Sequence, residues 1–152
     1  MASFSKDLTA RTPFGKNQYL RSTQDVKTES YTLSADAMPT NVTVDGTAVK
    51  ILQPGTVMAM ITSGPEAGKV GVYDATPGAG ITDGRAVEAN IIGIVDTFVP
   101  WTLDYRDVDI AVVYEAAVKA DWCLEHLDGT QQAMTGPTQT AVTAAVPTIT
   151  FK

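Results

Sequence analysis

Apolar segments of strand length, separated by turn residues, recur along most of this 152-residue sequence. The segment "TNVTVDGTAVKIL" alternates on both sides of Asp45 and Gly46, a dipeptide typical of a tight β-hairpin turn. The segments "PGTVMAMIT", "KVGVYD", "AVEANIIGIVDTFV" and "DVDIAVVYEAAV" continue the pattern between Gly, Pro and Asp residues. This length and spacing predict a mainly β protein, a small barrel or sandwich.

The remaining segments predict little helix. No long amphipathic stretch is present, so we expect only one or two helical turns, near "DGRAVEAN" or "TGPTQTAV". The segment "KADWCLEHL" is interpreted as a further strand, because Val118, Ala120, Trp122 and Leu124 alternate. The Thr-rich end of the chain predicts a short final strand.

The first 30 residues differ from the rest. Their large apolar side chains are scattered without a helical or strand period among Thr, Ser, Lys, Arg and Asn, which indicates an extended arm. This arm has five basic and three acidic residues, a net charge of +2, so the remainder carries −8 of the total of −6. We therefore predict an arm over residues 1–30 and one β-rich domain over residues 31–152. The charge is consistent both with a partner for the arm and with an arm that is merely soluble. The apolar side chains proposed for that contact are Phe4, Leu8, Phe14, Tyr19 and Leu20.

Charge and cysteine content restrict the partners and the compartment. An acidic protein with a pI near 4.6 is not expected to bind nucleic acid or an anionic membrane surface. No stretch approaches 18 consecutive apolar residues, and the first residues lack the apolar run of a signal peptide. The single cysteine allows no internal disulfide, and we expect synthesis in a cytosol-like compartment without a cofactor or a metal.

The stretch "TSGPEAGKVGVYD" contains a glycine-rich segment ending in Gly-Lys, like a phosphate-binding loop. Its two glycines, Gly64 and Gly68, are one residue too close, and Val70 stands where such a loop has Ser or Thr. A strand-like segment follows instead of a helix. We therefore interpret the stretch as a hairpin turn.

Two further clusters are candidate chemical sites. Cys123 and His126 could form a nucleophile and base pair, but on a strand their spacing of three places them on opposite faces. Asp104, Asp107 and Asp109 could bind calcium, but no Gly lies within the run to curve a ligand loop, so a solvated turn is favoured. Neither cluster supports a catalytic residue, and no enzymatic activity is expected.

Aromatic residues are concentrated in the second half of the chain. Trp101 and Trp122, with Tyr73, Tyr105 and Tyr114, could form a sugar-stacking face. Tyr and Trp are also typical of cores and protein interfaces, where a polar end finds a partner. We favour the core or an interface.

The region of roughly residues 50–125 resembles the head decoration, or cement, proteins of tailed phages, the family of phage lambda protein D. The segments concerned are "ILQPGTVMAMITSGPEAGKVGVYD", "TDGRAVEANIIGIV" and "VDIAVVYEAAVKADWCL". The positions that match the family pattern are Leu52, Gly55, Thr56, Val57, Lys69, Tyr73, Asp74, Asp83, Gly84, Gly93, Ile94, Val118 and Leu124. The long arm, the "EAN" before the Gly-Ile strand and the Thr-rich segment after residue 126 depart from that pattern.

The resemblance implies a β-tulip-like fold and a non-enzymatic structural role. Proteins of this family form homotrimers on the outer surface of the virion capsid, at threefold positions, and stabilise the phage head. Their N-terminal arms pair with the major capsid protein. For this chain the aromatic residues expected at a trimer interface are Trp101, Tyr105 and Trp122. Alternatives that the sequence leaves open are another virion module, such as a tail tube or head fibre base, and a carbohydrate-binding β module.

Overall fold

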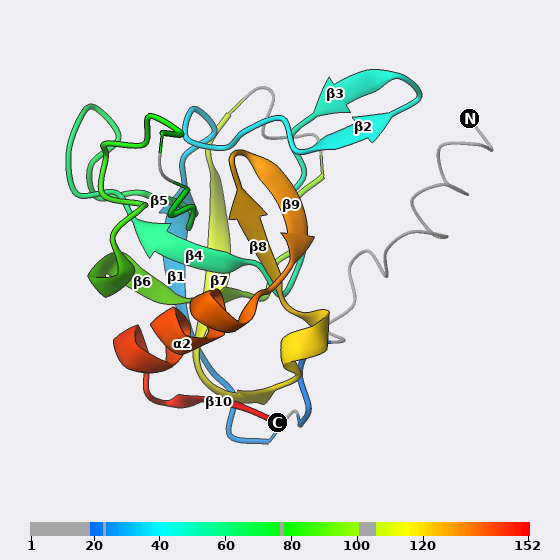
Figure 1. The fold of residues 1–152 in the computed structure, drawn as a ribbon, viewed down its shortest axis with the longest axis vertical. Helices are drawn as coiled ribbons and strands as arrows, with labels where there is room; N and C mark the ends of the chain where they lie inside the picture. The colour runs from blue at the N-terminus through cyan, green and yellow to red at the C-terminus, as the bar shows by residue number, and fades with distance from the viewer. Residues whose placement is uncertain (1–18, 23, 77, 101–105) are drawn as a thin grey trace.

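The computed structural model describes residues 19–22, 24–76, 78–100 and 106–152. Its centre is a closed five-stranded β-barrel in the order β1-β5-β4-β6-β7, with β7 pairing back to β1 (Figure 1). A sixth strand, β10, pairs in parallel with the C-terminal end of β7. These strands are β1 (Lys27–Leu33), β4 (Val57–Met60), β5 (Val70–Val72), β6 (Ile91–Val95), β7 (Val108–Val118) and β10 (Ile149–Phe151). The predicted class, a small mainly β fold, is confirmed in its barrel form.

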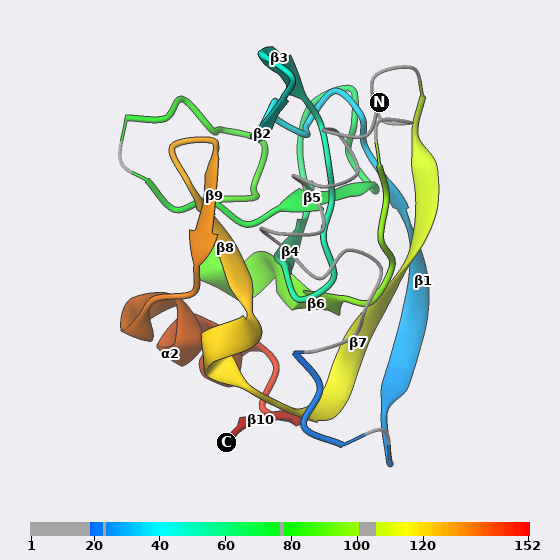
Figure 2. The same cartoon turned by 90° about the vertical axis from the view of Figure 1, so that its right-hand side faces the viewer.

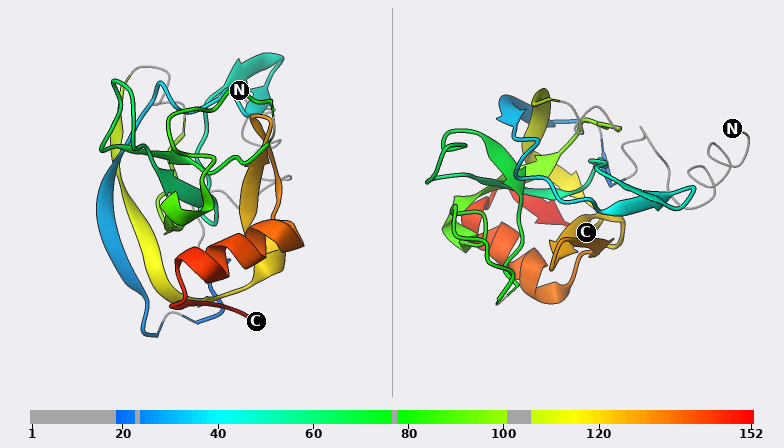
Figure 3. Two further views of the ribbon diagram at one scale, coloured as in Figure 1. Left: turned by 60° about the vertical axis from the view of Figure 1, so that its left-hand side comes forward. Right: turned by 90° about the horizontal axis from the view of Figure 1, so that it is seen from above.

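Two apolar clusters explain why β4, β6 and β7 are apolar on both faces. One cluster takes Leu33, Met58, Val70, Val95 and Val112 from the five barrel strands and fills the interior. The other takes residues of β4, β6 and β7, such as Val57, Ile94 and Val113, and packs them under the helix α2 (Gly136–Ala145). Figure 3 shows α2 lying across the outside of the barrel above β10. Burial on both faces accounts for the continuous apolar run "IIGIV" of β6.

The helical segments differ in part from the expectation. A 3₁₀ turn, η1 (Glu88–Asn90), lies in "DGRAVEAN" as predicted, whereas α2 is longer than the predicted one or two turns. Pro137 stands in its first turn, where the missing N–H costs no hydrogen bond, and its half-buried stripe packs on the barrel. No helix in the described ranges is long and apolar enough to cross a lipid bilayer.

The expectation that "KADWCLEHL" continues as one strand is wrong. The strand β7 ends at Val118, and residues Ala120–Trp122 form the 3₁₀ turn η3, closed by hydrogen bonds from the N–H groups of Trp122 and Cys123. This turn brings Leu124 to the carbonyl of Gly55, so β8 (Leu124–Leu127) leaves the barrel sheet. There it pairs with β9 (Thr130–Ala133) in a separate hairpin.

The predicted hairpin at Asp45 and Gly46 is confirmed. Strands β2 (Val42–Val44) and β3 (Thr47–Val49) pair in antiparallel register, and both turn residues have positive φ, 48° and 79°. Asp and Gly tolerate this left-handed conformation, which matches the twist of the flanking strands. The hairpin projects from the barrel in Figure 2.

The boundary predicted at residue 30 moves towards the N-terminus. Strand β1 begins at Lys27, and Tyr19, which the sequence pattern places in the arm, is buried in the apolar cluster under α2. Residues 19–22 and 24–30 of the predicted arm therefore belong to the folded body. Phe4, Leu8 and Phe14 lie outside the described residues.

Gly93 provides a test of how closely β6 and β7 pack. Its φ is +146°, and a Cβ built there would lie 2.1 Å from the carbonyl oxygen of Val113, a backbone atom that cannot move aside cheaply. We expect Gly93→Ala to lower the free energy of unfolding by about 3 kcal/mol or more, measured by urea denaturation.

Gly46→Ala is the matched control, because Gly46 also has a positive φ but a Cβ added to it would have no atom within 4 Å. We expect this control to lose about 1 kcal/mol. Equal losses in the two variants would contradict the steric explanation.

Candidate interaction surface at the N-terminal anchor

The segment Tyr19–Arg21 is fixed to the end of β7. The N–H of Lys119 donates to the carbonyl of Tyr19 at 2.7 Å, and the N–H of Arg21 donates to the carbonyl of Ala117 at 2.9 Å. The hydroxyl of Tyr19, whose side chain is 1% exposed, donates to Oδ1 of Asp96 at 2.5 Å. We call the segment Tyr19–Arg21 with these bonds the N-terminal anchor.

Two features hold the Tyr19 side chain of the N-terminal anchor in place. Gly55 leaves room for the Tyr19 ring, since a Cβ there would lie 3.3 Å from the Cβ of Tyr19 and 3.1 Å from the carbonyl oxygen of Trp122. Burial, with the hydrogen bond to the Asp96 carboxylate, raises the pKa of the Tyr19 hydroxyl far above its ordinary value. The hydroxyl therefore remains a donor at every pH at which the protein is handled.

The N-terminal anchor corrects the role predicted for Tyr19. Tyr19 is expected from the sequence to contact a capsid, but its side chain lies inside its own barrel and is inaccessible to a partner. Leu20 is half-buried and forms a bridge with Val118. The capsid contact stays a prediction for Leu20 and for Phe4, Leu8 and Phe14, which lie outside the described residues.

A hollow of about 320 Å³ lies beside the N-terminal anchor. Trp122, held out by the turn η3, is 49% exposed there and is one of the most exposed large apolar side chains in the described ranges. We call this feature the Trp122 hollow. Its lining residues are Arg21, Lys119, Ala120, Asp121, Trp122, Gln139, Phe151 and Lys152. Trp101 and Tyr105, the other aromatic residues predicted at a trimer interface, lie outside the described residues.

Cys123 and His126 have different partners. The Cys123 thiol is fully buried, donates to the carbonyl of Lys119, and has a pKa raised to about 12 by burial. The His126 ring is 2% exposed, and its Nε2 lies 2.9 Å from Nδ2 of Asn41. Because the thiolate is disfavoured and the imidazole faces another segment, the two side chains do not form a nucleophile and base pair.

The contact between His126 and Asn41 joins two hairpins. The side-chain amide of Asn41 donates to the carbonyl of Ile51 and accepts from the N–H of Ile51, which closes the base of the β2–β3 hairpin. The same amide N–H₂ group faces Nε2 of His126 in β8. His126 therefore accepts through Nε2 and must be neutral for this contact.

The acidic residues considered as calcium ligands have other partners. Asp107 accepts from the N–H of Ala35 at 2.8 Å and pairs with Nζ of Lys69 at 2.6 Å, while Asp109 accepts from the hydroxyl of Thr32. Asp104 lies outside the described residues. Within the part of the chain that the structure describes, no group of three His, Cys, Asp or Glu side chains could hold a metal ion.

The glycine-rich stretch forms the predicted hairpin turn. It joins β4 to β5, and the N–H of Ile61 donates to the carbonyl of Lys69 across it. Lys69 pairs with both Asp107 and Glu66, and hydrogen bonds to these carboxylates, that to Asp107 above all, raise the pKa of its ammonium. The lysine is therefore engaged by carboxylates and is not directed at a phosphate.

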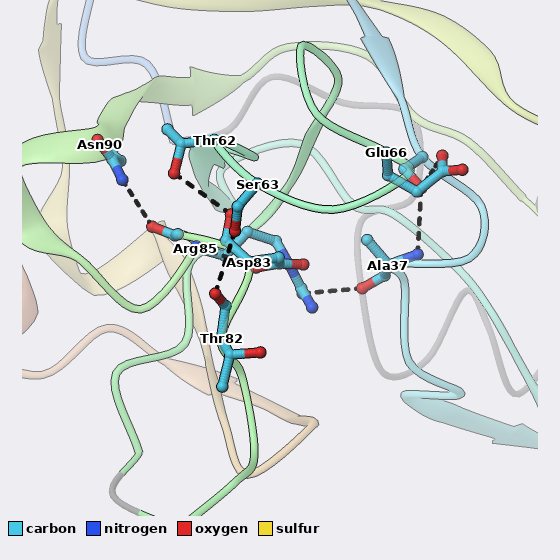
Figure 4. A network of polar contacts seen from close by, with 10 residues as sticks. Ala37, Thr62, Ser63, Glu66, Thr82, Asp83, Arg85 and Asn90 are labelled. Carbon is cyan, nitrogen blue, oxygen red and sulfur yellow. Dashed lines mark hydrogen bonds and ion pairs between the residues drawn. The ribbon is translucent and has the colours of Figure 1, made fainter.

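A polar network braces the stretch from the other side (Figure 4). Arg85 pairs with Asp83 at 2.9 Å and donates from Nη1 to the carbonyl of Ala37 at 2.8 Å. Ser63 and Asn90 donate to the carbonyls of Thr82 and Gly84. These contacts hold the two loops that flank β5 together and have a structural role.

Comparison with known proteins finds no match for this chain among protein-family models, curated proteins or solved structures.

The buried His126 predicts acid sensitivity. Burial lowers its pKa from the ordinary 6.5 to about 4 in the folded protein. Between pH 6.5 and pH 4 the unfolded chain binds a proton at His126 that the folded protein does not bind. The contribution of His126 to the free energy of unfolding is therefore fully present above pH 6.5 and is lost as the pH drops towards 4. We expect this loss to be about 3 kcal/mol. It is measured as the free energy of unfolding at a series of pH values.

The variant His126→Gln is the comparison, because an amide oxygen can replace Nε2 as acceptor for Asn41 without titrating. The two proteins share all other titratable groups, so the difference between their curves of unfolding free energy against pH isolates His126. Curves that stay parallel from pH 7 to pH 4 would contradict the assignment.

Proposed function

We propose that this chain is a non-enzymatic capsid decoration protein, which binds the outer surface of a phage head as a homotrimer at threefold positions and stabilises it. Two observations support the proposal. The residues from about 50 to 125 resemble that family, and the N-terminal anchor joins a basic segment to a closed barrel. The N-terminal anchor is the observation that carries the proposal.

The N-terminal anchor gives the preceding segment a fixed origin. The eighteen residues before Tyr19 carry Lys6, Arg11 and Lys16 against Asp7, with large apolar side chains between them. Fully extended, eighteen residues span up to about 60 Å, enough to reach beyond the barrel onto a neighbouring protein. An extended segment can add a strand to an exposed sheet edge, where backbone hydrogen bonds give affinity.

The energies indicate that the segment cannot bind alone. Phe4, Leu8 and Phe14 would gain about 1.5–3 kcal/mol each if they were fully buried on a partner. Ordering the backbone costs about 1–2 kcal/mol per residue, which exceeds that gain over the segment. Backbone pairing with the major capsid protein and the avidity of three linked copies must therefore supply the remainder.

Trp122 is the described residue best placed for a contact between copies. It is half exposed, lies on a short turn fixed between β7 and β8, and borders the N-terminal anchor. Exposed Trp is typical of residues that become buried in protein interfaces. Trp101 and Tyr105 remain predicted trimer contacts.

Removing residues 2–18 tests the proposal directly. The N-terminal anchor is retained in this variant, so the barrel should keep its stability. We expect co-sedimentation with mature phage heads stripped of decoration to be lost, while the full chain binds at a fixed ratio near three copies per threefold position. The full chain should also raise the temperature at which the heads rupture.

A variant with residues 2–18 in scrambled order is the matched control, since it keeps length, charge and composition. Binding by the truncated variant equal to that of the full chain would refute the role of the segment. Absence of head binding by the full chain would refute the decoration function itself.

A further inference from the structure

Three basic side chains that have no ion pair within the described residues meet at the Trp122 hollow. Lys27, Lys69 and Arg85 each pair with a carboxylate elsewhere in the structure. Arg21, Lys119 and Lys152 line the hollow, and no carboxylate of the described ranges lies within ion-pair distance of them. One acidic residue, Asp121, shares the lining. On a body whose net charge is strongly negative, this is a local positive site.

An open strand edge adjoins the Trp122 hollow. Strand β10 bonds to β7 through residues 148, 150 and 152, as shown by the bonds from Ala116 to Thr148 and from Lys152 to Val118. Because the backbone groups of successive strand residues point to opposite edges, those of Ile149 and Phe151 point away from β7. The N–H of Ile149 already donates to the carbonyl of Val146.

Three backbone groups therefore face outwards from β10: the carbonyls of Ile149 and Phe151 and the N–H of Phe151. No strand of the described residues pairs with this edge, because β10 is the last strand of its sheet. Figures 1 and 2 show β10, in red, at the same end of the body as the N-terminal anchor, in blue. The side chain of Phe151 lines the hollow, so an added strand would place every second side chain on the hollow's face.

We propose that the Trp122 hollow and the β10 edge together bind an extended acidic segment of a partner protein. The segment's backbone pairs with Phe151, its carboxylates reach Arg21, Lys119 and Lys152, and its apolar groups contact Trp122 and Phe151. The chain's own residues 1–18 do not suit this site, because they are basic. A nucleic acid is disfavoured, since it has no strand backbone to pair and the acidic body repels a long polyanion.

The inference replaces the contact between copies proposed above for Trp122, because one exposed side chain cannot serve both partners. It does not depend on capsid binding, because defined peptides can test it on the full chain. The probes are a blocked octapeptide of alternating Glu and Val, the same peptide with Lys for Glu, and an eight-residue oligothymidylate. Titrations followed by ¹⁵N NMR report both affinity and the hydrogen exchange of the Phe151 amide.

We expect the Glu peptide to bind at least about tenfold more tightly than the Lys peptide and to lose affinity as salt rises. The Phe151 amide should exchange at least about tenfold more slowly in the complex, with little change at Thr150, whose amide is already paired with β7. Equal affinity for the two peptides, equal affinity for the oligothymidylate, or an unprotected Phe151 amide would overturn the proposal.

Matched variants separate charge from backbone pairing. Arg21→Gln, Lys119→Gln and Lys152→Gln should each weaken the Glu peptide, whereas Arg106→Gln, an exposed residue outside the hollow, should not. Phe151→Pro removes the outward N–H at a position where Pro is tolerated, and Phe151→Ala removes the same ring but keeps that N–H. Equal affinities of the two Phe151 variants, with both shown to be folded by their NMR spectra, would refute strand addition.

Discussion

The strand β7 holds the rest of the body together through its backbone hydrogen bonds. It pairs with β1 along most of its length, with β6 on its other edge, and with both β10 and the N-terminal anchor at its C-terminal end. Eleven residues thus set the register for segments from both ends of the chain. Its side chains enter both apolar clusters, so a change of register would displace the interior and the layer under α2 together.

Much of the fold can be predicted because it depends on local chemistry. Asp45 and Gly46 specify their own turn, and the segments that form β4 to β7 are apolar enough to identify. The β8–β9 hairpin is not predicted by the sequence pattern, although Asp128 and Gly129 turn there with positive φ. The apparent alternation from Val118 to Leu124 conceals it, since a 3₁₀ turn interrupts that segment.

The interaction surface is less accessible to sequence reasoning. The sequence pattern places Tyr19 in an arm because its partners, Asp96 and Lys119, are distant along the chain. The three basic residues of the Trp122 hollow likewise come from both ends of the chain and from the end of β7. Only Trp122 can be singled out, on the general tendency of Trp to lie in interfaces. Long-range pairing, which no local pattern encodes, brings these residues together.

The position of the N-terminal anchor also determines how the body would bear a mechanical load. A pull on the first residues enters at Tyr19 and passes directly to β7 and, through Asp96, to the end of β6. Both strands belong to the closed barrel, in which β7 is also bonded to β1 and β10. The hairpins β2–β3 and β8–β9 lie off this path and can deform without transmitting tension. A chain tethered by its N-terminus would thus be held through the barrel and not through either hairpin.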